Sequence, residues 1–433
     1  ATEALLPKFR ASGQSQEVVR AYLHILGARS ALNSQEKAVR HLSTVPWPSD
    51  LLSQTVLNLY MAGSYQGYLS RYFWEISQRE KVVSTDAVDL KKWTKEEIYA
   101  AINDRFYRVW LQRKGLGQLE PSVIKEHLAP GDYPKEIRGT LRDTLVYEWA
   151  SRVRNTGSWT PKQESSTHGL DLDNLLSKDP AVVDLSDTAV HPLSRFAALL
   201  AEHEAWHRDN GRIGAALEAF LVRVQGLYFT LKTQQERDRI RAHLRARLDT
   251  EKQQPWWTTG MAKLGKFAQQ SGQPNAVLEA YKIAMECIQL HEGTKGHEQC
   301  SALAHNLKLP EWKIESMRTD NTKRASIRLQ YKNMSKIHFS AWKIDYTDLV
   351  LKPNRLGRRH SHRIWMPYVK KKLVGTEPSH RWSATLSETK DLKMHTHYVT
   401  PPFSERGDYI VVAHEGDRPD GENSKAIHLN LSN

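Results

Sequence analysis

The run His203-Glu204-Ala205-Trp206-His207 has the residue types and spacing of a zinc peptidase, H-E-x-x-H, within a predicted helix. Histidines four residues apart lie on one face of a helix and can bind zinc together. The glutamate between them would act as the general base. A zinc hydrolase is therefore one function that these residues could perform.

A zinc peptidase also needs a third protein ligand, which we looked for downstream of His207. A metzincin would have a glycine and a histidine where Asn210 and Ile213 stand, and a thermolysin-like enzyme would have a glutamate near Gly226. We therefore expect neither a metal site nor a catalytic residue in this run, and zinc hydrolysis remains an alternative function. The structural interpretation is a solvated helix end, with Trp206 packed inward and the polar residues outward.

The character of the chain changes near residue 320, where helical periodicity gives way to strands. The segments 327–331, 336–344 and 407–413 are rich in β-branched and aromatic residues and are bounded by turn residues. About 300 residues before them show mainly helical periodicity. With 39% hydrophobic residues and 13 tryptophans, the chain has the composition of a folded protein, and it has no apolar run of membrane-spanning length. We expect an all-α region followed by an antiparallel β-sandwich. Its inward-facing residues should be Ile327, Leu329, Tyr331, Phe339, Trp342 and Val411 or its neighbours.

The domain organisation that we predict has four parts. Residues 1–154 form a helical subdomain with a long helix through 51–80, and 155–192 form a connector rich in loop residues. Residues 193–310 form stacked helix pairs, and 321–433 form the β-sandwich. Part of the stack is tetratricopeptide-like, because small and aromatic residues recur at suitable offsets, namely Leu264, Gly265, Tyr281 and Ala284. A helical solenoid and an irregular helical bundle both remain open.

Five runs resemble bacterial alpha-2-macroglobulin-like proteins. RLQYKNMSKIHFSAWKIDYTDL (328–349) and RGDYIVVAHEGDRPDGENSKAIHLNL (406–431) are similar to the opening and closing strands of the first macroglobulin-type β domain. The runs 51–82, 132–153 and 191–212 resemble the helical N-terminal region of the same family. The resemblance implies an N-terminal segment of a much longer, protease-trapping endopeptidase inhibitor with an extracytoplasmic location.

The cysteines bear on this resemblance. Many members of the family carry a thioester in which a cysteine precedes Glu-Gln, but residues 296–300 read Gly-His-Glu-Gln-Cys, in the reverse order. We therefore expect no thioester within this chain. Cys287 and Cys300 are its two cysteines, and adjacent antiparallel helix ends would bring them within disulfide reach. An extracytoplasmic location, which the resemblance implies, would preserve such a bridge, and two small buried apolar residues are the alternative.

The chain is basic, with a formal net charge of +13 and an isoelectric point near 9.5. Such a charge favours acidic partners or anionic surfaces. Nucleic acid is not an expected partner, because no reader motif is present. The segment 349–376 concentrates cations without an acidic residue, and its candidate docking residues are Arg355, Arg358, Arg359, Arg363, Lys370, Lys371 and Lys372. It could dock a neighbouring domain, an acidic partner or an anionic lipid, or be a solvated loop.

The function that we expect is that of a non-catalytic scaffold without a cofactor. The family inhibits proteases through a bait region and a conformational collapse, and neither a bait region nor a thioester occurs in these residues. The expected partners are other domains of the same large protein, the proteases trapped by the full-length protein, and envelope proteins. A location in the periplasm, on the cell surface or outside the cell is expected, with any membrane anchor outside this chain. The alternative is a free-standing helical-repeat adaptor of an envelope complex.

Overall fold

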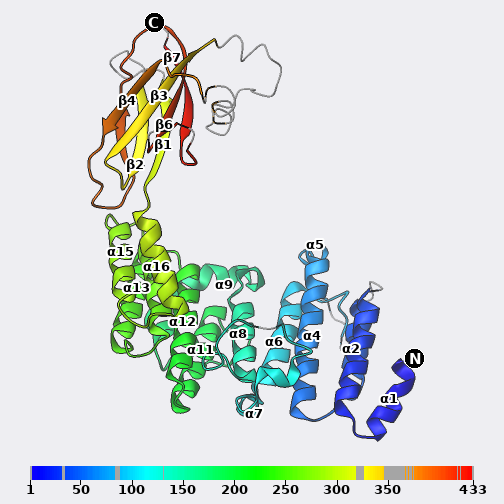
Figure 1. The fold of residues 1–433 in the computed structure, drawn as a ribbon. Coiled ribbons are helices and arrows are strands. Elements are labelled where there is room, and N and C mark those ends of the chain that lie inside the picture. Colours follow the sequence, from blue (N-terminus) through cyan, green and yellow to red (C-terminus); the bar gives the residue numbers. More distant parts are fainter. Residues whose placement is uncertain are drawn as a thin grey trace. The chain divides into compact units, whose positions relative to one another are not determined.

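The computed structural model describes residues 2–31, 35–82, 88–129, 131–317, 326–345, 366, 369, 373, 375–416, 418–419 and 421–431. The chain divides into two compact units, Ala1–Gly260 and Met261–Asn433. The first unit is helical, and the second begins with helices and continues as antiparallel sheets (Figure 1). An α-then-β layout is therefore present, as the sequence predicts.

The N-terminal unit is built from helices that follow one another along the chain. They are α1 (Thr2–Ala11), α2 (Ser15–Ala31), α3 (Gln35–Thr44), α4 (Leu51–Arg71), α5 (Phe73–Ile76), α6 (Lys95–Trp110), α7 (Arg113–Leu116), η1 (Pro121–Ile124), α8 (Leu141–Arg154), η2 (Thr156–Ser158), α9 (Pro161–Ser166), η3 (Thr167–Gly169), α10 (Leu172–Leu176), α11 (Pro192–Asp209), α12 (Ile213–Thr230) and α13 (Gln234–Thr250). The boundary between the units falls within α14 (Trp257–Gln269).

Local sequence signals set where several of these helices begin. Thr94, Thr140 and Thr233 each cap a helix and accept a hydrogen bond from a backbone N–H three residues later. The acidic residue at that third position, such as Asp143 in α8, accepts a bond from the backbone of the threonine in return. This reciprocal capping box satisfies backbone donors that the first helical turn leaves unpaired. It also fixes the position of the Asp143 carboxylate.

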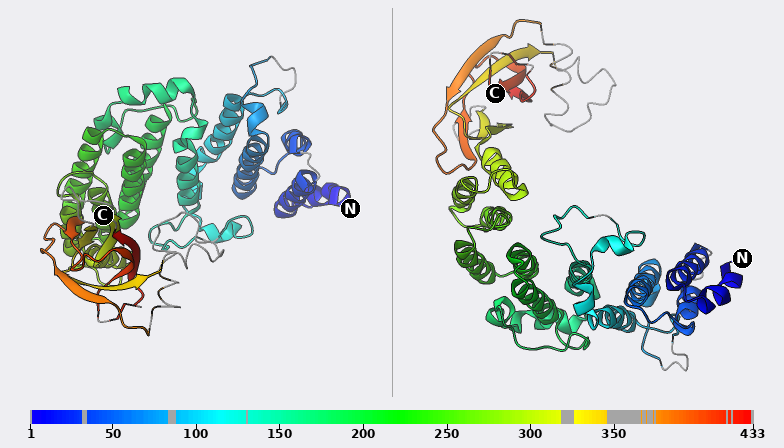
Figure 2. Two further views of the ribbon diagram at one scale, coloured as in Figure 1. Left: turned by 90° about the horizontal axis from the view of Figure 1, so that it is seen from above. Right: turned by 60° about the horizontal axis from the view of Figure 1, so that its bottom comes forward.

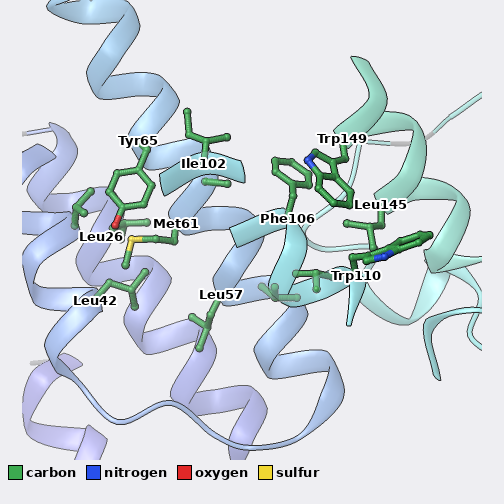
Figure 3. Packing of buried hydrophobic residues seen from close by; sticks show 14 of the residues in the cluster. Leu26, Leu42, Leu57, Met61, Tyr65, Ile102, Phe106, Trp110, Leu145 and Trp149 are labelled. Atoms are coloured by element: carbon green, nitrogen blue, oxygen red, sulfur yellow. The ribbon is translucent and has the colours of Figure 1, made fainter. Parts of the chain in front are cut away.

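Successive helices of the unit pack against their neighbours and share a hydrophobic core. α2 contacts α3 and α4, α4 contacts α6, α6 contacts α8, α8 contacts α11, and α11 contacts α12 (Figure 2). Figure 3 shows the core between α4, α6 and α8, where the rings of Phe106 and Trp149 stack with their centroids 6.4 Å apart. Because each helix buries one face against the next, the core is continuous from Leu6 to Leu200.

Two helical predictions differ from the structure in detail. The long helix expected through 51–80 ends at Arg71 and is followed by the single turn α5. The expected loop-rich connector, 155–192, contains four short helical segments, η2, α9, η3 and α10. Capping side chains explain η2, α9 and α10, because Asn155, Thr160 and Asp171 each accept a hydrogen bond from a following backbone N–H.

The C-terminal unit combines helices with two antiparallel sheets. After α14 come α15 (Ala276–Cys287) and α16 (Lys295–Lys308). The strands are β1 (Glu311–Met317), β2 (Ser326–Lys332), β3 (Lys336–Ile344), β4 (His380–Thr385), β5 (His395–Val399), β6 (Gly407–His414) and β7 (Lys425–Leu431). One sheet has the order β1-β2-β5 and the other β4-β3-β6-β7. The register pairs Ile314 with Leu329 in the first sheet and Ala341 with Val411 in the second.

Buried residues from both sheets form a single hydrophobic cluster. It includes Ile327, Leu329 and Tyr331 of β2 together with Phe339 of β3 and Val411 of β6. We expected Trp342 in this set, and that prediction was wrong. Trp342 lies in a separate cluster with Ile410 and Val412. The reason is the two-residue period of a strand, which places positions 339 and 342 on opposite faces.

Strand β1 was missed, because the expected β region began at residue 321. Its sequence, EWKIESM, alternates exposed and buried positions, and Trp312 and Ile314 point into the core. The alternation is short and lies directly after a helix, so it gave only a weak signal. Among the described residues, no helix has both the length and the apolar character needed to cross a membrane.

Candidate functional site

The two histidines of the H-E-x-x-H run meet a carboxylate inside the N-terminal unit. His203 and His207 lie one turn apart on α11, and Asp143 lies in the first turn of α8. The distances from Asp143 Oδ1 to the two Nε2 atoms are 3.0 Å for His203 and 2.8 Å for His207, and the two Nε2 atoms are 3.1 Å apart. All three residues are fully buried. Within the described part of the chain, this is the only group of three or more His, Cys, Asp or Glu arranged to hold a metal ion.

The second carboxylate oxygen holds Asp143 in place. Asp143 Oδ2 accepts hydrogen bonds from the backbone N–H of Thr140 at 2.8 Å and from its hydroxyl at 2.9 Å. Arg212 Nη2 lies 3.5 Å from the same oxygen. These contacts leave Oδ1 directed toward the histidines, and Oδ1 has no hydrogen-bond partner of acceptable geometry.

Burial and charge set the protonation of the group. Burial lowers the pKa of His203 to about 4 and also lowers the pKa of His207, so both imidazoles are neutral near pH 7. Burial alone would raise the pKa of Asp143, but its contacts with His203 and His207 outweigh burial and hold the pKa well below the usual range. The site is thus one carboxylate and two neutral imidazoles, a donor set suited to zinc.

Aromatic rings enclose the two imidazoles. The Tyr147 ring meets His203 edge-on at 5.5 Å, and the Trp206 ring lies 5.7 Å from His203 and 4.7 Å from His207. The guanidinium of Arg142 covers the Trp206 ring at 4.2 Å. The enclosure keeps bulk water from the imidazoles, which is the physical cause of their lowered pKa values.

Glu204 points into a different environment from the histidines. Its carboxylate pairs with Arg223 at 2.9 Å, Arg208 at 2.8 Å and Arg247 at 3.3 Å. Both Glu204 and Arg223 are almost completely buried. One residue along a helix turns the side chain by about 100°, so Glu204 faces α12 and α13 while the histidines face α8. A general base must reach the metal-bound water, and a carboxylate held by three arginines does not.

These findings correct two parts of the sequence interpretation. The solvated helix end was wrong, because His203, Glu204 and His207 are buried while Trp206 is only half-buried. The missing third ligand was sought downstream, whereas Asp143 lies upstream on another helix. The only local signal at Asp143 was the pattern Thr140-x-x-Asp143, which indicates a helix start and says nothing of the histidines.

The remaining candidate residues lie apart from this group. Cys287 and Cys300 are joined by a disulfide within the C-terminal unit, with their Cα atoms 6.2 Å apart. Cys300 is the last residue of the reversed Glu-Gln-Cys run at 296–300. Because it is in the disulfide, it is not a free thiol. The candidate basic docking loop lies outside the described residues, which applies to Arg355, Arg358, Arg359, Arg363, Lys370, Lys371 and Lys372.

A hollow of about 1320 Å³ lies beside α4 and α8 in the N-terminal unit. α4 contributes Tyr60, Gly63 and Gly67 to its wall, and α8 contributes Thr144 and Tyr147. A Cβ atom added at Gly63 or Gly67 would meet nothing within 4 Å, so this face of α4 is open. The hollow is large enough to receive side chains from another polypeptide.

Comparisons with known proteins do not assign the chain to a family, because no family model matches it and no curated protein shows significant similarity.

Proposed function

We propose that this chain is a non-catalytic scaffold and interaction segment of a protease-trapping protein of the alpha-2-macroglobulin type. The proposal combines a helical solenoid, partly tetratricopeptide-like, with a macroglobulin-type β-sandwich in an extracytoplasmic protein. Its partners are other domains of the same protein, the proteases that the full-length protein encloses, and envelope proteins.

The observation that carries the non-catalytic assignment is the environment of Glu204. Its carboxylate is held by Arg208, Arg223 and Arg247, while His203 and His207 lie on another side of α11, facing α8. Releasing it for proton transfer would leave Arg223 buried without a counter-charge, which is costly. A scaffold role requires no such release, and rigid buried ion pairs suit it.

The architecture supports the scaffold assignment. Helices that mainly contact their neighbours in sequence are typical of solenoids, which present extended surfaces to other proteins. Two antiparallel sheets that share one hydrophobic cluster are typical of a sandwich. The runs that resemble the family's opening and closing strands, 328–349 and 406–431, contain most of β2 and all of β3, β6 and β7.

The hollow beside α4 is the interaction surface that we assign to the N-terminal unit. Its wall combines the open glycines Gly63 and Gly67 with aromatic side chains such as Tyr60 and Tyr147. Open glycines let a partner backbone approach closely, and aromatic residues are enriched at protein interfaces.

Protease trapping is tested on the full-length protein encoded by the same reading frame. After incubation with a broad-specificity protease, cleavage of a small peptide should persist while cleavage of a large protein substrate should fall, because only small molecules reach an enclosed protease. A catalytically inactivated protease is the control. It should neither cleave the inhibitor nor cause its conformational collapse. A reading frame that ends at Asn433, or unchanged cleavage of large substrates, would contradict trapping and favour the free-standing adaptor.

A peptidase assay of this chain with added zinc distinguishes the zinc hydrolase from the two non-catalytic alternatives, the protease-trapping segment and the free-standing adaptor. We expect no hydrolysis of a mixed peptide library. Hydrolysis that disappears in Glu204→Gln would overturn the non-catalytic assignment, because that variant removes the general base while keeping its size.

A further inference from the structure

We propose that Asp143, His203 and His207 form a zinc site that fastens α8 to α11. The three donor atoms come from two helices and surround one point, with separations of 2.8–3.1 Å. Tetrahedral zinc with bonds of about 2.0–2.1 Å would set its ligand atoms about 3.3 Å apart. The distance between each two of these donor atoms would therefore increase by only a few tenths of an ångström on binding. The backbone already places the donors for binding.

Hydrogen bonding alone does not satisfy this triangle. If both Nε2 atoms carry hydrogen, both donate toward Asp143 Oδ1, and the two N–H groups lie side by side with their nitrogens only 3.1 Å apart. If only one carries hydrogen, the other presents a lone pair to the carboxylate at 2.8 or 3.0 Å. One side of the triangle is repulsive in either case, whereas a cation at its centre makes all three contacts favourable.

The surroundings have the features of a built site. Thr140 and Arg212 hold Asp143 Oδ2, which orients Oδ1 in the way that outer hydrogen bonds orient metal ligands. Nδ1 of each histidine has no hydrogen-bond partner, so both tautomers are open and Nε2 can present its lone pair, although the Nδ1–H of a zinc-bound ring has no acceptor here. The ligand set of two imidazoles and a carboxylate fits zinc, with water in the fourth position.

The ion acts as a structural link between the helices. Glu204 lies on another side of α11, where three arginines hold it, so no base stands beside the metal-bound water. Asp143 belongs to the first turn of α8, and the histidines belong to the last two turns of α11. Binding ligands from both helices would stabilise their packing in the N-terminal unit.

The first test measures zinc in the whole chain after expression in zinc-supplemented medium and dialysis against metal-free buffer. We expect about one zinc per chain by elemental analysis, and a melting temperature that rises by several degrees when zinc is returned to chelator-treated protein. Asp143→Asn should lose the zinc, because an amide is a poor ligand, while its oxygen can still accept the backbone N–H of Thr140 in the capping box. His207→Gln should lose it as well.

The matched control is His397→Gln, which removes an exposed histidine from β5 and should leave the zinc content unchanged. Circular dichroism establishes that each variant is folded. If the triad variants do not fold, cobalt replacing zinc in the unmodified chain provides the readout, through the strong visible absorption of a tetrahedral ion that zinc then displaces.

Three outcomes would overturn the proposal. They are dialysed protein with less than about a tenth of a zinc per chain and no thermal shift, equal zinc in folded Asp143→Asn and unmodified protein, or a cobalt spectrum typical of an octahedral hydrated ion. Loss of zinc in His397→Gln but not in the triad variants would place the ion on the surface and would equally overturn it.

Discussion

Glu204 and Arg223 form an ion pair inside the N-terminal unit, with 2.9 Å between Oε2 and Nη2 and side chains that are only 3% and 1% exposed. Arg247 also faces this carboxylate, at 3.3 Å. The pair joins α11 to α12, and Arg247 brings in α13. The glutamate of the H-E-x-x-H run therefore connects three helices.

Glu204→Ala should lower the free energy of unfolding of the N-terminal unit by about 3–5 kcal/mol, because Arg223 would remain buried without its counter-charge. Urea unfolding followed by circular dichroism measures the change. Arg208→Ala is the control, since Arg208 pairs with the same carboxylate but is 43% exposed, and it should cost less than about 1 kcal/mol. Equal effects of the two variants would contradict the buried network.

Two glycines should respond oppositely to alanine. Gly63→Ala should raise the stability of the N-terminal unit by about 0.5–1 kcal/mol, because alanine favours the helix and the new Cβ meets nothing within 4 Å. Gly226→Ala should lower it by about 1–3 kcal/mol, because the Cβ would lie 2.3 Å from Phe196 Cζ and 2.8 Å from Arg154 Cδ. Thermal unfolding of the two variants measures the direction of each change in stability. Destabilisation by Gly63→Ala would show that this face of α4 is covered.

His191 should make the stability of the N-terminal unit depend on pH. Its Nδ1 accepts the Leu193 N–H at the start of α11, and its Nε2 lies 2.8 Å from the Gln163 carbonyl. Burial lowers the pKa of His191 and outweighs the contact with the Gln163 carbonyl, which raises it, and the nearby charge of Arg195 lowers it further. The unfolded chain therefore binds the proton more readily than the folded chain. The contribution of neutral His191 to the free energy of unfolding is fully present above about pH 6.5 and is lost as the pH falls below that value.

The matched variant is His191→Asn, which retains a capping side chain but does not titrate. Urea unfolding at about pH 7.5 and about pH 5 should show a smaller loss of stability in the variant than in the parent. Other histidines with a lowered pKa, such as the half-buried His243, titrate equally in both proteins and cancel in the comparison. An identical loss in the two proteins would show that His191 is protonated without cost.

The Cys287–Cys300 disulfide should stabilise the C-terminal unit by about 3 kcal/mol, the value expected for a short closed loop. The two cysteines are separated by 13 positions and are fully buried. The double variant Cys287→Ala, Cys300→Ala avoids burying hydroxyl groups and should lower the melting temperature of this unit alone. Intact mass after alkylation without reductant should show no modified cysteine, and two alkylated thiols would contradict the bridge.

The sequence by itself determined the change from helices to strands and the position of three strands. The predicted strands 327–331, 336–344 and 407–413 lie within β2, β3 and β6, because alternation and β-branched residues are local signals that a strand needs in any setting. The strands β1, β4 and β5 and the short helices of 155–192 were missed, because brief elements depend on capping bonds and on pairing with distant strands.

Only the tertiary structure decided what the H-E-x-x-H run does. Its spacing correctly places His203 and His207 on one face of α11, which follows from helix geometry. That this face meets Asp143 of α8, while Glu204 meets Arg223 of α12, depends on how three helices pack. Side-chain periodicity gives the direction in which a residue points from its own helix. The residue that it meets there belongs to another element, and the packing of the whole core determines which residue that is.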